Sequence, residues 1–324
     1  MQRRMVQSTE FMLVMIYSVV FCLCGTAFPR EIWVDWTQEL PDANGTENKP
    51  YSKINTAIAN ASITGDVIKV KPGVYKEDVV IDKDLVLSGV SGPDVTLIYG
   101  IGNAITINAD KEVTVERFTV TSSTENGVCL IKYNTSRNVL IRNILSVGNS
   151  KNGLYKNSSD CKARLCCCNC TFVGNSISGA WANAYSTFEN CISTDNNSYG
   201  FTSPTTNWPR VERSLAAQNK TANYHNVDQF ENLSESTQPG YLEFEIGDFR
   251  LAQDSPCRHT GKIGTIYLNP DGSRNDIGAY GGPGAEGFYE RYGNAPVVRD
   301  LHIAPGSAVE EGTTITITAT GEAH

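Results

Sequence analysis

The sequence predicts an all-β protein: a right-handed parallel β-helix with an N-terminal capping helix, followed by a truncated β-sandwich segment. Three observations carry this prediction. Residues 54–61 repeat apolar side chains at helical spacing, and residues 67–87 then change to the shorter period of strands. The third observation is an internal repeat, in which turn glycines follow one another at intervals of 26, 26 and 21 residues: Gly127, Gly153, Gly179 and Gly200.

The capping helix is expected to begin after Ser52, whose hydroxyl can bond the free backbone N–H groups of the first turn. Ile54, Ala57 and Ile58 would form its apolar face. A parallel sheet leaves an exposed first edge that can pair with another chain, and a helix laid across that edge would block it. We therefore expect the helix to close the N-terminal end of the solenoid.

Alignment on the four glycines places apolar residues above one another in successive rungs. In a β-helix each inward side chain packs on its equivalent in the next strand, about 4.8 Å away. The aligned positions are therefore predicted core columns, Val115, Ile141, Cys167 and Phe188 in one and Phe118, Ile144, Cys170 and Cys191 in the other.

The first rungs resemble the N-terminal module of the pectate-lyase-like β-helix superfamily. The matching motifs are Ile54–Ile58, Gly65–Val70, Pro72–Glu77 and Leu85–Gly89. Residues 248–283 are similar to the closing segment of secreted bacterial β-helix proteins. These resemblances imply the fold. They select no reaction, because the superfamily contains lyases, hydrolases, esterases and non-catalytic adhesive domains.

Three regions are expected along the chain. Residues 1–27 read as a signal peptide, with Arg3 and Arg4 before an apolar run that is short for a membrane span. Residues 28–284 form the β-helix. Residues 285–324 alternate Thr and Ile in their last part and resemble the start of an immunoglobulin-like or PKD-like domain. We expect a secreted or cell-surface monomer, with no membrane span in the mature chain.

Composition restricts the partners. The net charge of −8 argues against a nucleic-acid ligand, because such proteins present basic surfaces. Eight of the ten cysteines follow the signal segment, and the run Cys166–Cys168 fits neither a disulfide framework nor C-x-x-C metal spacing. Small apolar core residues are the favoured interpretation, with room for one or two disulfides, for instance at Cys161.

The candidate ligand surface is the strand that follows each turn glycine. Its outward positions include Tyr155 and Trp181 and, two residues on, Asn157 and Asn183. Flat rings can stack on sugars and amides can bond their hydroxyls. The predicted contact residues are those four together with two lysines that could meet an acidic sugar, Lys132 and Lys156. The alternative is that the two aromatic side chains lie under a turn or against a neighbouring protein.

The favoured function is polysaccharide binding or surface contact, with a glycan as partner. The alternative is a carbohydrate-active enzyme, a polysaccharide lyase or glycoside hydrolase on acidic polysaccharide, in which Lys132 or Lys156 would act with acids from a covering loop. A third hypothesis is a spacer without a ligand. No catalytic residue is assigned, because no two acids align on the same outward face of the predicted sheet.

Two clusters of acidic residues are candidates for metal binding. Glu189 and Glu212 fall at equivalent positions of successive rungs, where Arg210 and Arg213 could neutralise them. Asp271, Ser273 and Asp276 could bind calcium, although pairing of the acids with Arg274 to fix the last rung is favoured. We therefore assign no metal and no cofactor, and keep calcium as the open alternative.

Overall fold

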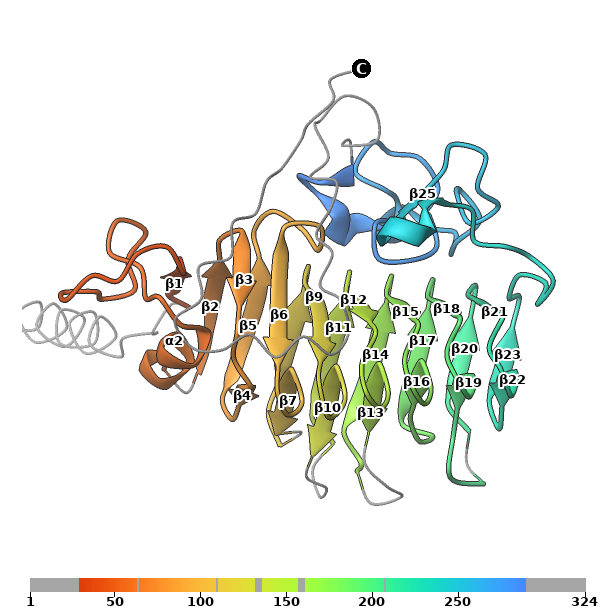
Figure 1. Ribbon diagram of the computed structural model, residues 1–324, viewed down its shortest axis with the longest axis horizontal. Coiled ribbons are helices and arrows are strands. Elements are labelled where there is room, and N and C mark those ends of the chain that lie inside the picture. The colour runs from red at the N-terminus through yellow and green to blue at the C-terminus, as the bar shows by residue number, and fades with distance from the viewer. Residues whose placement is uncertain are drawn as a thin grey trace, which may run out of the picture. The chain divides into compact units, whose positions relative to one another are not determined.

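The computed structural model describes residues 29–62, 64–108, 110–131, 136–156, 161–206 and 208–289. Within them the chain coils through three parallel sheets, visiting each sheet once per rung (Figure 1). All rung-to-rung pairings between neighbouring strands are parallel. The predicted parallel β-helix is therefore confirmed. The signal segment 1–27 and the alternating Thr/Ile part of the sandwich segment lie outside the described residues.

Sheet 1 has nine strands, in the spatial order β1 (Glu31–Val34), β2 (Thr64–Val70), β5 (Asp84–Gly89), β8 (Val113–Glu116), β11 (Asn138–Arg142), β14 (Arg164–Cys168), β17 (Ser186–Glu189), β20 (Arg210–Glu212) and β23 (Asp228–Phe230). Sheet 2 has seven, β22 (Ala222–His225), β19 (Tyr199–Thr202), β16 (Ala180–Trp181), β13 (Leu154–Lys156), β10 (Val128–Ile131), β7 (Ile105–Asn108) and β4 (Val79–Ile81). Sheet 3 also has seven, β21 (Leu215–Ala217), β18 (Ile192–Thr194), β15 (Thr171–Val173), β12 (Leu145–Val147), β9 (Thr119–Ser122), β6 (Thr96–Gly100) and β3 (Gly73–Tyr75).

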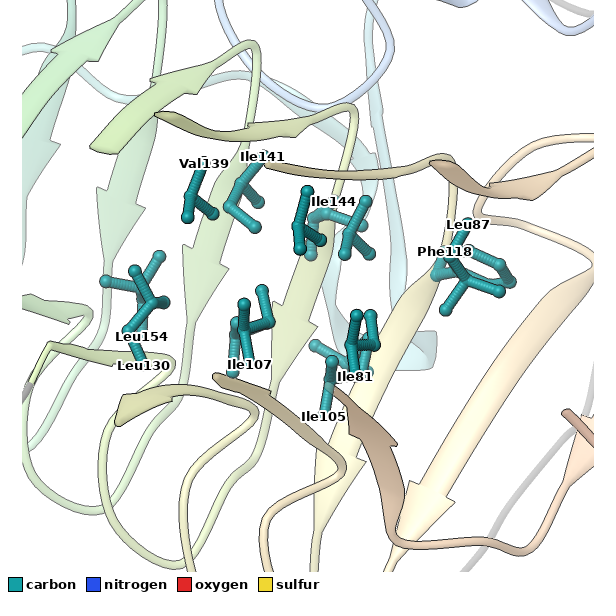
Figure 2. Close-up of a cluster of buried hydrophobic side chains, with 14 of the residues drawn as sticks. Ile81, Leu87, Ile105, Ile107, Phe118, Leu130, Val139, Ile141, Ile144 and Leu154 are labelled. Carbon is teal, nitrogen blue, oxygen red and sulfur yellow. The ribbon is translucent and has the colours of Figure 1, made fainter. Parts of the chain in front are cut away.

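The inward side chains of the three sheets form one continuous apolar core (Figure 2). The register of sheet 1 stacks Val115 on Ile141, Ile141 on Cys167, and Cys167 on Phe188. This is the first predicted column. The residues of the second column are all fully buried as well. The repeat spacing of the turn glycines therefore gives the correct register of the rungs.

Helix α2 (Ile54–Asn60) forms where the sequence predicts it, with Ile54, Ala57 and Ile58 buried. Its capping differs from the prediction, since Ser52 makes no capping bond and the residue before the helix is Lys53. The Glu77 carboxylate instead accepts hydrogen bonds from two backbone N–H groups of the first turn, at 2.8 and 3.0 Å. A distant acid thus satisfies donors that a local hydroxyl usually satisfies.

Buried asparagines connect the rungs at the turn between sheets 3 and 2. The amide of Asn149 donates to Asn175 at 2.7 Å, Asn175 to Asn196 at 2.8 Å, and Asn196 to Asn219 at 2.8 Å. Each of these amides donates to its equivalent one rung away, so the buried Nδ2 groups of Asn149, Asn175 and Asn196 find acceptors of the same kind. This ladder explains the asparagine-rich turns, since a buried amide without partners is costly.

The C-terminal segment returns along the solenoid and covers the outer face of sheet 3. It contains β24 (Tyr241–Glu243), β25 (Asp248–Leu251) and three short 3-10 helices, η1 (Phe244–Ile246), η2 (Thr265–Tyr267) and η3 (Pro283–Ala285). Leu145 and Val173 of sheet 3 pack against Phe249 and Tyr280 of this segment. The predicted role of fixing the last rung is too narrow. The segment packs across several rungs, from β12 to β21.

The eight cysteines of the described residues are free thiols. Cys167, Cys170 and Cys191 are fully buried in the core, which agrees with their interpretation as small apolar residues. Cys166 and Cys168 differ, because they lie on the opposite face of β14 and are partly exposed.

Candidate functional site

The outward face of sheet 2 carries the candidate site. Its parallel register aligns one outward residue per rung. From β4 to β22 these residues are Val80, Thr106, Cys129, Tyr155, Trp181, Thr202 and His225. The middle of this column is aromatic, and the residues on either side are small or polar.

Tyr155 and Trp181 lie next to each other on β13 and β16, as predicted. Their ring centroids are 6.4 Å apart and the ring planes are tilted by 46°. Both side chains are half-buried, so each presents part of its ring to solvent. A sugar ring could stack on this surface, since such contacts need a flat apolar face.

A second aromatic pair extends the same face. The ring of Tyr199 stacks on the imidazole of His225, with centroids 4.6 Å apart and planes 20° from parallel. The Thr202 hydroxyl lies 3.0 Å from His225 Nδ1 and holds the imidazole in place. This pair was not part of the predicted surface. His225 lies on β22, and Asp228 lies on β23.

A hollow of about 420 Å³ lies beyond the C-terminal ends of these strands. Its lining residues follow β16, β19 and β22 in the chain: Ala184, Thr206, Trp208 and Asp228. Trp208 is 45% exposed, so its ring is accessible from the hollow. Among the described lining residues Asp228 supplies the carboxylate, so a pair of acids for glycoside hydrolysis is not formed by them.

Asn183 does not lie on the exposed face, contrary to the prediction. Strand β16 ends at Trp181, so the alternation that predicts an outward side chain stops before residue 183. The side chain is buried, donates to the Cys161 carbonyl at 2.9 Å and accepts from the backbone N–H of Tyr185 at 3.2 Å. Asn183 holds two turns together.

Lys156 does not lie at the outer face either, contrary to the prediction. It lies inside the solenoid and is 0% exposed, because Leu154 and Lys156 share the inward face of β13. Its ammonium donates to the Ala163 carbonyl at 2.6 Å and to Asn183 Oδ1 at 2.7 Å. Burial lowers the pKa of Lys156 to about 8, although the nearby Cys161 thiol opposes this. A buried amine cannot meet a sugar on the outer face.

Lys132 and Asn157 lie outside the described residues, so their predicted contacts stay predictions. The six predicted contact residues thus divide into three groups. Tyr155 and Trp181 lie together on the outer face, Lys156 and Asn183 lie inside, and the other two are undescribed. Sequence reasoning missed Tyr199 and Trp208. Tyr199 directly precedes the turn glycine Gly200, and Trp208 follows the end of β19 by six residues, so neither belongs to the outward positions that alternation predicts.

Glu189 and Glu212 stack on successive strands of sheet 1, as predicted. Their neutralising partner differs. Lys262 from the C-terminal segment lies 2.7 Å from Glu189 and 3.4 Å from Glu212. Arg210 also pairs with Glu212, whereas Arg213 pairs with Glu231.

The predicted pairing of Arg274 with the acids of residues 271–276 is wrong, since Arg274 donates to two backbone carbonyls, those of Gly261 and Thr260. Asp276 is buried and accepts from the backbone N–H of His259 at 2.7 Å. Asp271 is exposed and accepts from the backbone N–H of Ser273 at 2.9 Å. Calcium binding by this loop stays the open alternative.

No family model matches the chain. A curated cell surface glycoprotein of Methanothermus fervidus is 28% identical over 140 residues, which are 41% of this chain. The match spans 22% of the length of that relative, about a fifth. No helix among the described residues is long and apolar enough to cross a membrane.

Solved structures that resemble the chain include a pectate lyase, with a TM-score of 0.45 and 14% identity, covering 79% of this chain and 97% of that one. The rice weevil pectin methyl esterase has a TM-score of 0.42 and 12% identity, covering 73% and 92%. The pectin methylesterase of Erwinia chrysanthemi has a TM-score of 0.39 and 11% identity, covering 70% and 94%. At these scores the superpositions carry no argument about activity.

Proposed function

We propose that the chain is a secreted or cell-surface β-helix domain that binds polysaccharide on the outer face of sheet 2. The observation that carries this proposal is the half-exposed pair Tyr155 and Trp181. The hollow beside Trp208, lined by residues that follow strands of the same sheet, supports it. The similarity of part of the chain to a protein named a cell surface glycoprotein supports the location.

The arrangement suits a chain of sugars better than a single small molecule. Aromatic side chains of this face occur on four consecutive rungs, at Tyr155, Trp181, Tyr199 and, in the edge strand, His225. Since rungs are about 4.8 Å apart, the Tyr155–Trp181 surface and the His225–Tyr199 stack can contact successive parts of one extended ligand. Thr206 and Asp228 add polar groups that can orient hydroxyls in the hollow.

The test is affinity electrophoresis of the full chain in gels that contain neutral or acidic polysaccharides. We expect at least one polymer to retard the wild-type chain. The Trp181→Ala variant should bind about tenfold more weakly, which corresponds to the ~1.4 kcal/mol of one aromatic contact. Trp208→Ala should weaken binding separately if the hollow takes part.

Trp36→Ala is the matched control. Trp36 is 50% exposed and lies against Gly73 of sheet 3, away from the proposed surface. Its replacement should leave retardation unchanged. Equal weakening by Trp36→Ala and Trp181→Ala, in variants of unchanged circular dichroism, would contradict the proposal. Release of new reducing ends during incubation would favour the enzyme alternative instead.

A further inference from the structure

Strand β14 carries sulfur on both faces, and its outer face holds a cluster that sugar binding does not use. Cys166 and Cys168 are two residues apart on the strand, so their side chains share the outward face of sheet 1. The register places Cys168 beside Glu189 of the next rung. Two thiols and one carboxylate therefore meet at one point of the surface.

The distances fit a single metal ion. The two sulfurs are 2.9 Å apart, and the ligand atoms of Cys166, Cys168 and Glu189 all lie within 4.8 Å of one another. Two thiolates on one tetrahedral zinc would be separated by about 3.8 Å, given Zn–S bonds of about 2.3 Å. Small side-chain rotations would bring all three atoms to bonding distance. We propose that Cys166, Cys168 and Glu189 form a binding site for a thiophilic divalent cation of the zinc type.

Charge balance supports this site. Two thiolates and one carboxylate contribute three negative charges, the ion contributes two positive charges, and Lys262, 2.7 Å from Glu189, contributes one. The occupied cluster with its lysine is therefore neutral. Binding follows the equation M²⁺ + 2 RSH → M(SR)₂ + 2 H⁺, in which the ion replaces both thiol protons and nothing is oxidised. Water can fill the fourth position, because both cysteines are partly exposed.

The inner face of β14 offers a competing cluster. Cys167, Cys170 and Cys191 also have ligand atoms within 4.8 Å of one another, but all three are fully buried in the apolar core. Three thiolates around a divalent ion would carry a net negative charge there without a cation in the cluster. Placing such a charge in the core is expensive. The cysteines of the outer cluster are partly exposed, and Lys262 balances the remaining negative charge of the occupied site, so we assign the ion to this cluster.

Cobalt is the probe, because tetrahedral Co²⁺–thiolate sites absorb visible and near-ultraviolet light. The full chain, reduced with a phosphine, is titrated with Co²⁺ and then with Zn²⁺. We expect a saturable band at one ion per chain, which Zn²⁺ abolishes. Cys166→Ser or Cys168→Ser should weaken Co²⁺ binding at least tenfold, and the double variant should lose the band. Glu189→Gln should weaken binding without removing sulfur ligands.

Two control variants test other thiols. Cys22→Ser/Cys24→Ser removes the cysteines of the N-terminal segment, and Cys170→Ser/Cys191→Ser removes two of the inner cluster. Both should keep the band, with circular dichroism as the check of folding. A wild-type chain that gives no band would overturn the proposal. Retention of the band in the Cys166/Cys168 double variant, with loss in the inner variant, would overturn it as well.

Discussion

The buried amine of Lys156 gives the sharpest test of the core. Its ammonium lies inside the solenoid, where Leu130 occupies the equivalent position of the preceding rung. Replacing Lys156 with Met keeps an unbranched apolar stem and removes the charge. The variant loses the hydrogen bonds to the Ala163 carbonyl and to Asn183, so its stability at one pH mixes two effects. The pH dependence separates them.

The size of the expected change in stability follows from the lowered pKa of Lys156. Folding shifts the pKa of Lys156 from 10.5 to about 8, so between these values the unfolded chain binds more protons than the folded one. Stability must then rise with pH across that interval. Lowering the pKa by about 2.5 corresponds to a loss of ~3.4 kcal/mol in the free energy of unfolding. The whole loss is present well below pH 8, where Lys156 is charged in the folded chain. Between pH 7 and pH 9.5 the recovered part is about 2 kcal/mol.

The assay is urea unfolding of both proteins at pH 7 and pH 9.5, followed by circular dichroism. Ionisation of the other buried thiols and of the tyrosines cancels in the comparison, because both proteins contain them. Burial raises the pKa of the Cys161 thiol and the Lys156 charge lowers it, so both proteins also carry Cys161→Ser. The free energy of unfolding of the wild type, minus that of Lys156→Met, should increase by about 2 kcal/mol. Lys151→Met is the control, since Lys151 is 44% exposed and pairs with Glu125 at the surface. An unchanged difference, or the same change in the control, would refute the argument.

Two further predictions concern the contacts between rungs. Asn175→Ala removes the middle of the asparagine ladder. The backbone N–H and the amide of Asn149 both lose their acceptor Asn175 Oδ1, and Asn196 Oδ1 loses one of its two donors, so the free energy of unfolding in urea should fall by about 2–4 kcal/mol. Asn197→Ala, at an exposed position of the next turn, should change it by less than about 0.5 kcal/mol. Burial opposes charge on Lys262, yet the hydrogen bond to Glu189 raises the pKa of Lys262 above its usual value. This stabilisation is fully present at pH 7, so Lys262→Met should cost about 1–2 kcal/mol there, and equal stabilities would contradict the assigned contact.

The solenoid could be predicted because its determinants are local and periodic. Alternation within a strand fixes which side chains point inward, and the turn glycines fix how rungs align. Phe188 therefore lies on Cys167 although 21 residues separate them. Glycine is required at the turn positions because the backbones of neighbouring rungs approach closely there. A Cβ on Gly153 would lie 2.6 Å from the Gly179 carbonyl oxygen of the next rung. A repeated steric requirement of this kind leaves a repeated sequence signal.

The contact residues were harder to predict, for two physical reasons. Alternation holds only while the strand continues, so it placed Tyr155 and Trp181 correctly and failed at Asn183, two residues beyond the end of β16. For Lys156 alternation itself favours the interior, since it lies two residues after the inward Leu154, and its position near the aromatic pair gave the wrong assignment. Its burial is tolerated because acceptors from a later turn surround it, including Asn183 and the Tyr185 carbonyl. Such partners cannot be read from the strand itself.

The return of the C-terminal segment decides which faces of the solenoid can meet a partner. Strands β15, β18 and β21 are buried on both faces, because the segment packs over sheet 3. A solenoid without this segment would offer three outer faces. The described part of the segment covers sheet 3 from β12 to β21 and contacts sheet 1 through Lys262, which pairs with Glu189 and Glu212. Sheet 2 presents half-exposed rings, and sheet 1 presents thiols and acids. These surfaces differ in chemistry and belong to different sheets, so a glycan and a metal ion can bind without competing.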